Sequence, residues 1–211
     1  MESPITFAVH EKLICASSEF FKKIMSRDWK ESKQRSIQLE DDDPDTFQLY
    51  LHWLYRGTLP VRTDGPGRIA NSEYLQLAMA YVLGDKLQDG DFQDITIDAM
   101  IDKCKSPASD GAKWFPVGSV IQCIYDNTPE SSKARRLLVD IYVHNGCSGW
   151  LRDSMKPDEI PKDFLFEIAI AFLDTRTNEV NPVAKSSTCE YHQHGPERAL
   201  CYKTRLGERQ D

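Results

Sequence analysis

Two short stretches of the chain alternate between apolar and polar residues, which is the pattern of a half-buried strand. In residues 5–10, Ile5, Phe7 and Val9 fall on one face, and residues 36–39 repeat the alternation more briefly. Side chains of a strand point alternately to its two faces, so each stretch predicts a short strand with one buried face.

The clearest helix is predicted between Asp43 and Gly57. Asp43 suits the N-cap, Pro44 the first helical position and Gly57 a left-handed C-cap. Between these ends, apolar side chains recur at the spacing of one buried helical face: Phe47, Tyr50, Leu51 and Leu54. The segment therefore predicts a helix that packs along one side.

Less sharply bounded helices are predicted on both sides of this one. Their apolar spacing covers residues 11–17, 18–25 with Ser18 as N-cap, 72–86, 92–103 and 119–126, and further starts fall at 128–130 and 161–163. We predict a mixed α+β fold, mostly helical, in which a few short strands pack against a cluster of helices.

The pattern also divides the chain along its length. Small residues predict a linker at 106–116, and beyond Asp174 the sequence becomes polar and aperiodic. We expect a first domain over 1–105, the linker at 106–116, a helical extension over 117–175 and a polar tail over 176–211. Such a tail is mobile unless a ligand orders it.

Composition and charge narrow the class of protein. Of 211 residues, 40% are hydrophobic, and the formal net charge is −7 without a basic stripe. An acidic chain has no electrostatic attraction to nucleic acid or to anionic lipid. No apolar run is long enough to span a bilayer, and the start lacks the pattern of a signal peptide. We expect an intracellular protein, in cytoplasm or nucleus, with no membrane and no nucleic acid among its partners.

Two motifs now resemble the BTB/POZ domain. Residues 7–21 are similar to its entry, where a strand ends in a histidine and leads to an apolar turn, serines and an aromatic pair. Residues 43–59 resemble its central helix with an aromatic-Tyr-x-Gly exit. The helices after the linker resemble the extensions of BTB proteins from filamentous fungi. The resemblance implies an intracellular protein-binding scaffold.

BTB/POZ domains usually begin with a strand that precedes the one predicted at residues 5–10. Met1 leaves no room for that strand, so the domain is expected to be N-terminally truncated. In the family, this strand and the first helix form much of the homodimer interface. A homodimer through the usual face is therefore expected to be impaired, because its sheet would lack an edge partner.

The resemblance further implies an adaptor role in a cullin-type ubiquitin ligase. The positions that match the cullin-binding element are Trp29 and Glu31, helped by Tyr55 at the end of the central helix. A tryptophan can anchor in a partner pocket and a carboxylate can pair with a basic rim. The alternative for these residues is that Trp29 packs on its own domain and Glu31 is solvated. Two other functions stay open: a truncated regulator that pairs with full-length BTB relatives, and a transcriptional regulator.

The tail carries a set of side chains suited to zinc: Cys189, His192, His194 and Cys201. Two thiolates and two imidazoles form a common tetrahedral zinc site, although this spacing is not that of a standard finger. The alternative is that these residues have no metal role. No other cofactor is expected.

Catalytic motifs are not found. The acidic run at 40–45 lacks the ligand spacing of a calcium loop, and Gly65–Gly67 lacks that of a phosphate loop. The sequence also has no hydrolase nucleophile elbow. We therefore predict no catalytic residues and no enzymatic activity.

Overall fold

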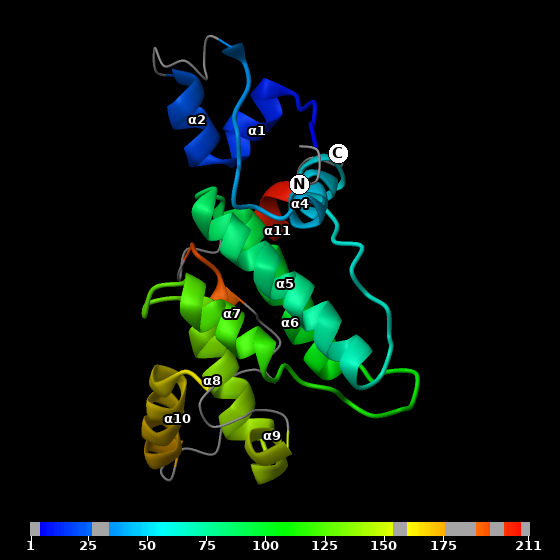
Figure 1. Cartoon of the computed structure of the whole chain (residues 1–211), viewed down its shortest axis with the longest axis vertical. Coiled ribbons are helices and arrows are strands. Elements are labelled where there is room, and N and C mark those ends of the chain that lie inside the picture. Colours follow the sequence, from blue (N-terminus) through cyan, green and yellow to red (C-terminus); the bar gives the residue numbers. More distant parts are fainter. Residues whose placement is uncertain (1–4, 27–33, 154–159, 176–188, 195–200, 208–211) are drawn as a thin grey trace.

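The computed structural model describes residues 5–26, 34–153, 160–175, 189–194 and 201–207. Its centre is a pair of long helices, α5 (Arg68–Lys86) and α6 (Gly90–Lys105), joined by a short turn. In Figure 1 this pair separates the N-terminal helices at one end from α9 and α10 at the other. The predicted mostly helical fold is confirmed.

The N-terminal helices form a first apolar cluster on one side of the pair. They are α1 (Glu11–Ser17), α2 (Glu19–Ser26) and α4 (Pro44–Arg56). The cluster joins Phe21, Tyr50 and Trp53 to Leu83 of α5 and Phe92 of α6. The aromatic rings of Tyr50 and Phe92 meet edge to face at 4.9 Å. Burial of such large side chains is what draws these short helices onto the pair.

The caps predicted for α4 and α2 are confirmed. Asp43 Oδ2 accepts a hydrogen bond from the Thr46 amide at 2.8 Å, and Gly57 has the left-handed φ of 70° at the C-cap. At α2, Ser18 Oγ accepts from the Phe21 amide at 3.2 Å and donates to the Leu87 carbonyl at 2.5 Å. Ser18 thus caps α2 and fastens it to the end of α5 at once.

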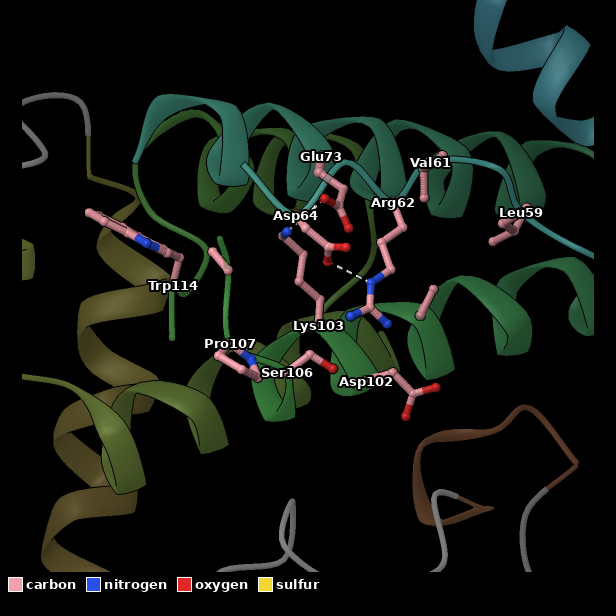
Figure 2. Close-up of a pocket in the computed structure, with 12 residues that line it drawn as sticks. Leu59, Val61, Arg62, Asp64, Glu73, Asp102, Lys103, Ser106, Pro107 and Trp114 are labelled. Atoms are coloured by element: carbon pink, nitrogen blue, oxygen red, sulfur yellow. Dashed lines mark hydrogen bonds and ion pairs between the residues drawn. The ribbon is translucent and has the colours of Figure 1, made fainter. Parts of the chain in front are cut away.

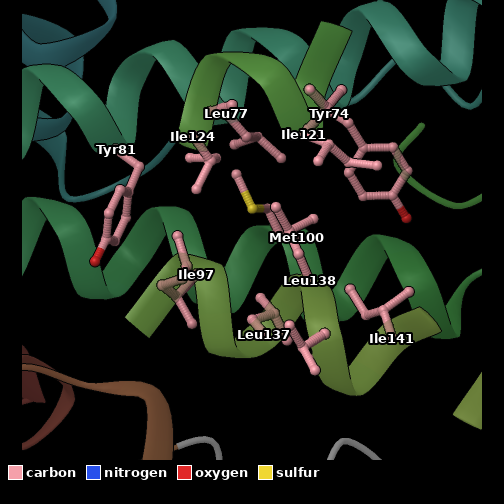
Figure 3. Packing of buried hydrophobic residues seen from close by; sticks show 14 of the residues in the cluster. Tyr74, Leu77, Tyr81, Ile97, Met100, Ile121, Ile124, Leu137, Leu138 and Ile141 are labelled. Atoms are coloured by element: carbon pink, nitrogen blue, oxygen red, sulfur yellow. The ribbon is translucent and has the colours of Figure 1, made fainter. Parts of the chain in front are cut away.

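The helices beyond residue 117 form a second, larger cluster on the same central pair. They are α7 (Ser119–Asn127), α8 (Lys133–Asn145), α9 (Ser148–Asp153) and α10 (Lys162–Thr175). Figure 3 shows Leu77 and Met100 of the pair facing Ile124, Leu137 and their neighbours from α7 and α8. The central helices are therefore buried from both sides.

The linker expected at 106–116 contains no helix and is tied to the helices around it. Tyr74 of α5 donates its hydroxyl to the Trp114 carbonyl at 2.9 Å, and Tyr142 of α8 donates to the Pro116 carbonyl at 3.2 Å. Because the helices before and after it share one core, the segment joins parts of a continuous structure. The division into domains stays a prediction.

The short strands predicted at 5–10 and 36–39 are not formed. In the described residues, neither segment has a neighbouring strand with which to exchange backbone hydrogen bonds. The apolar alternation instead serves packing on helices, since Phe7, Val9 and Ile37 lie against the first cluster. The rings of Phe7 and Phe47 are 5.2 Å apart. Alternation thus selected side chains that pack on this cluster, but it was wrong for Ile5, which is 62% exposed, and for the backbone partner.

The expectation of a mobile tail is wrong for the parts of the tail that the structure describes. Residues 189–191 form a short 3-10 helix (η2, Cys189–Tyr191) and α11 covers Tyr202–Gly207. Tyr191, His192 and Cys201 are all buried. Tyr191 contacts Asp140 of α8 and His192 lies against α6, so packing orders a segment whose sequence shows no periodicity.

The outer face of α10 remains apolar and exposed. Its large side chains there are Leu165, Phe166, Ile170, Phe172 and Leu173. None of the helices in the described part of the chain has both the length and the apolar character needed to cross a membrane.

Candidate functional site

Four side chains of the tail, which we call the Cys–His cluster, converge on one point: Cys189, His192, His194 and Cys201. One potential ligand atom from each lies within 4.8 Å of all the others. The sulfur atoms of the two cysteines are 3.9 Å apart, Cys201 Sγ is 3.5 Å from His192 Nδ1, and His192 Nδ1 is 3.2 Å from His194 Nε2. The structure thus brings together all four residues that the sequence singled out as zinc ligands.

A carboxylate of α6 lies beside the central imidazole of this cluster. Asp98 Oδ1 lies 3.1 Å from His192 Nε2. The other oxygen of Asp98 is held by Lys203 at 2.8 Å and by the Tyr202 hydroxyl. When the hydrogen of neutral His192 lies on Nε2, toward this carboxylate, the lone pair is on Nδ1, which lies 3.5 Å from Cys201 Sγ. In this form Nδ1 can bind a metal ion or accept a hydrogen bond.

A second carboxylate, Asp94, lies one helical turn before Asp98 on the same face of α6. Its Oδ1 accepts the Gln193 amide at 2.6 Å, and its Oδ2 lies 3.7 Å from His192 Nδ1. Desolvation raises the pKa of Asp94 to about 7, although His192 lowers it. Asp94 therefore positions the backbone of the turn more directly than it contacts the imidazole.

Two tyrosines explain why the tail reaches this place. Tyr191 is almost fully buried in the second cluster and donates its hydroxyl to Asp140 of α8 at 2.9 Å. Tyr202, at the start of α11, buries its ring beside His192, with ring centroids 5.6 Å apart. Between these two anchors, burial raises the pKa of the Cys201 thiol. Without a metal this thiol is protonated at neutral pH.

The residues predicted to bind a partner are only partly visible. Trp29 and Glu31 lie outside the described residues. Tyr55 lies in the last turn of α4 with 47% of its surface exposed. Its hydroxyl accepts the His10 amide at 3.0 Å and lies 2.7 Å from His10 Nδ1. Tyr55 therefore connects the end of α4 to the segment before α1 and still presents its ring to solvent.

A pocket of about 180 Å³ lies elsewhere, between the 59–64 segment, α5 and α6. Figure 2 shows Glu73, Asp64, Arg62 and Lys103 gathered together, while Asp102 points away from them. Glu73 pairs with Lys103 at 2.7 Å while accepting the Thr63 amide at 3.1 Å, and Arg62 pairs with Asp64 at 2.6 Å. Glu73 thereby joins α5 both to α6 and to the 59–64 segment, whereas the Arg62–Asp64 pair lies within that segment.

Comparison with known proteins concerns the N-terminal half. Residues 3–89 match the family model of the BTB/POZ domain, which covers α1, α2, α4 and α5. The chain contains a BTB/POZ domain. Such domains are protein-interaction modules. No solved structure matches the chain.

Curated relatives share the same region. Kelch repeat and BTB domain-containing protein 4 of Mus musculus is 34% identical over 58 residues, which are 28% of this chain and 11% of that protein. Kelch-like protein 40 of Xenopus laevis is 33% identical over 55 residues, which are 26% of this chain and 9% of that protein. The chain thus spans about a tenth of the length of the curated relatives it matches.

The Cys–His cluster lies beyond the part that matches the BTB/POZ domain, although it packs on the helix that directly follows. The sequence indicated its four candidate ligands but gave no indication of Asp94 and Asp98. The sequence feature that could have indicated these two residues is their i, i+4 spacing along α6, beside the buried Ile97 and Ile101. An acidic stripe on a helix is usually solvated, so only the fold shows that this one faces histidine.

Proposed function

We propose that this chain is a protein-interaction scaffold that acts as a substrate adaptor for a cullin-type ubiquitin ligase. The observation that carries the proposal is the BTB/POZ domain at residues 3–89. Both relatives named above carry BTB or Kelch in their names and share this region with the chain. The partner of the adaptor would contact the surface at the end of α4 and after α2.

Trp29, Glu31 and Tyr55 would form the contact with the cullin. Tyr55 has the properties of an anchor, because its ring is exposed while its hydroxyl is held in place by His10. A ring that is already fixed loses little conformational entropy on binding. Trp29 would fill an apolar pocket of the partner, and Glu31 would pair with a basic group at the rim.

The lack of enzymatic activity stays a prediction. It is supported by the pocket between α5 and α6, where the carboxylate of Glu73 and the amine of Lys103 are paired with each other. General acid–base chemistry needs a group within reach of a substrate and in the right protonation state. A surface that binds proteins needs neither.

The adaptor role is tested by a binding experiment with purified cullin. The double variant Trp29→Ala plus Glu31→Lys is expected to recover at least about tenfold less cullin than the unchanged chain, because it removes an aromatic anchor and reverses a charge. A matched control, Trp114→Ala plus Glu130→Lys, alters a tryptophan and a glutamate on another part of the surface and should bind as the unchanged chain does.

Equal or absent cullin recovery with the unchanged chain and the Trp29/Glu31 variant would end the proposal. Light scattering of the same samples tests the alternative, in which the chain pairs with a longer BTB protein. If the chain forms a mixed pair with a longer BTB protein and no cullin complex, its role is regulation by pairing and the adaptor function is refuted.

A further inference from the structure

Three separations within the Cys–His cluster match those of a tetrahedral metal site. With zinc bonds of about 2.3 Å to sulfur and about 2.0 Å to nitrogen, the edges of a tetrahedron are about 3.8 Å between sulfurs, 3.5 Å between sulfur and nitrogen and 3.3 Å between nitrogens. The three corresponding distances are 3.9, 3.5 and 3.2 Å. We propose that the Cys–His cluster binds one Zn²⁺ ion, which fastens the C-terminal segments to α6.

The surroundings of the cluster have the second layer of contacts that zinc sites usually show. A metal-bound histidine almost always donates its other ring N–H to a carboxylate or carbonyl, which fixes the tautomer and the ring plane. Here Asp98 Oδ1 lies 3.1 Å from His192 Nε2, and Nδ1, which is 3.5 Å from Cys201 Sγ, is the ring atom that can bind the metal. Asp98 is in turn held by Lys203 and Tyr202, so the imidazole has little freedom to rotate.

Charge balance also favours this ion. Each cysteine would lose its thiol proton to solvent when the metal binds, so two thiolates offset the two charges of Zn²⁺ and the imidazoles stay neutral. His192 is fully buried and Cys201 is 3% exposed. A neutral unit is the form in which metal and ligands can be enclosed at low cost. Four protein ligands leave no open position, so the ion would be structural and not catalytic.

Two metal-free arrangements compete with this proposal. A disulfide between Cys189 and Cys201 requires a sulfur–sulfur distance near 2.05 Å, and the two sulfurs are 3.9 Å apart. Protonated His192 between Asp94 and Asp98 would form a buried ionic triad. Its Nδ1, however, is closer to His194 and Cys201 than to Asp94, which is 3.7 Å away.

Metal content of the purified full chain tests the site. Produced with zinc in the medium, the unchanged protein should hold about one zinc ion per chain, and Cys201→Ser should hold at least about tenfold less. Cys147→Ser, which changes an exposed cysteine outside the cluster, is the matched control and should keep its zinc. A folded, zinc-free unchanged chain would overturn the proposal, as would a Cys189→Ser plus Cys201→Ser variant that keeps full zinc.

Cobalt substitution avoids the difficulty that a ligand variant might not fold. Co²⁺ added to the zinc-depleted, reduced chain should give the intense visible bands of a tetrahedral site and the near-ultraviolet charge transfer of thiolate ligands. Octahedral cobalt bands, or a Cys189–Cys201 disulfide in peptides mapped from the freshly isolated protein, would refute the zinc site. Neither result depends on cullin binding.

Asp98→Asn separates a positioning residue from a merely structural one. This variant should weaken zinc affinity by about 10- to 100-fold while the tetrahedral cobalt spectrum persists, because the ligands remain and only their orientation is lost. Unchanged zinc affinity would show that Asp98 does not support the site through His192.

Discussion

Asp89 shows how one residue joins three helices and what that burial costs. It is the N-cap of α6, where Oδ1 accepts the Phe92 amide at 3.0 Å. Its Oδ2 accepts the hydroxyls of Ser17 at 2.6 Å and Tyr50 at 3.0 Å, which belong to α1 and α4. Desolvation nevertheless raises the pKa of Asp89 from 3.8 to about 6, against the effect of these hydrogen bonds.

This raised pKa has a defined effect on stability. The folded chain holds the proton of Asp89 more tightly than the unfolded chain. Protonation of Asp89 therefore adds to the free energy of unfolding, fully so below pH 4, and this addition is lost as the pH rises through 6. The loss amounts to about 3 kcal/mol. Asp89→Asn does not titrate, so the unfolding free energy of the unchanged chain minus that of the variant should fall by about 2 kcal/mol of this total between pH 4 and pH 7.

Urea unfolding of both chains at several pH values measures this difference. Because the two chains share every other titrating group, the difference isolates Asp89. A difference that grows with pH would mean that the three donors stabilise the carboxylate by more than its burial destabilises it.

Two phenylalanines of α10 provide a matched pair for the value of burial. Phe164 is fully buried against the rings of Tyr125 and Tyr142, whereas Phe166, two residues later, is 67% exposed. Phe164→Ala should lower the free energy of unfolding by about 3–5 kcal/mol, because it removes apolar contacts and leaves a cavity. Phe166→Ala should change it by less than about 0.5 kcal/mol. Thermal and urea unfolding check both values, and similar losses in the two variants would show that the exposed face of α10 is covered in solution.

At the scale of elements, α4 depends on its N-cap. Asp43 accepts both the amide and the hydroxyl of Thr46 through Oδ2, at 2.8 and 2.7 Å. Asp43→Ala leaves that amide without its partner and should destabilise the chain by about 1 kcal/mol. Asp41→Ala, which removes an exposed carboxylate two residues earlier, is the control and should leave the urea midpoint unchanged. Equal midpoints for all three chains would contradict the capping role.

The elements that the sequence predicted best are those whose ends are marked by capping residues. Asp43, Pro44 and Gly57 bound α4 as expected because each acts through its nearest backbone neighbours. The start of α8 was expected near Thr128 but lies at Lys133. Thr128 instead donates its hydroxyl to the Ile124 carbonyl at 2.6 Å and accepts from Arg135 at 3.3 Å. That tertiary network has no signature in local spacing.

The Cys–His cluster, too, could be predicted from the sequence only in part. Residue type alone selected the four candidate ligands, since two thiols and two imidazoles within thirteen positions are a recognisable set. What the sequence could not predict is the support from Asp98, which lies about a hundred residues away and reaches His192 only because Tyr191 and Tyr202 bury their rings on α8 and α6. Long-range contacts of this kind depend on the packed core.

At the scale of the whole molecule, the BTB/POZ domain and the helices after it share their central helices. Leu77 and Tyr81 of α5 enter the second cluster, while Ala80 and Leu83 of the same helix enter the first. A helix buried on both sides cannot keep its environment if either side detaches. We therefore expect the two parts to unfold together, although the similarity to the BTB/POZ family ends near α5.

Leu137→Ala tests this coupling from the far side of the core. Leu137 of α8 is fully buried (Figure 3), and its truncation should destabilise the chain by about 2–5 kcal/mol. If the chain unfolds as one unit, hydrogen exchange measured by mass spectrometry should show the same loss of protection in α4 and α5 as in α8. Phe166→Ala, which removes an exposed ring, should leave all three helices protected. Loss confined to α7, α8 and α10 would instead mean that the BTB/POZ part folds independently, and the shared burial of α5 would then contribute little to its stability.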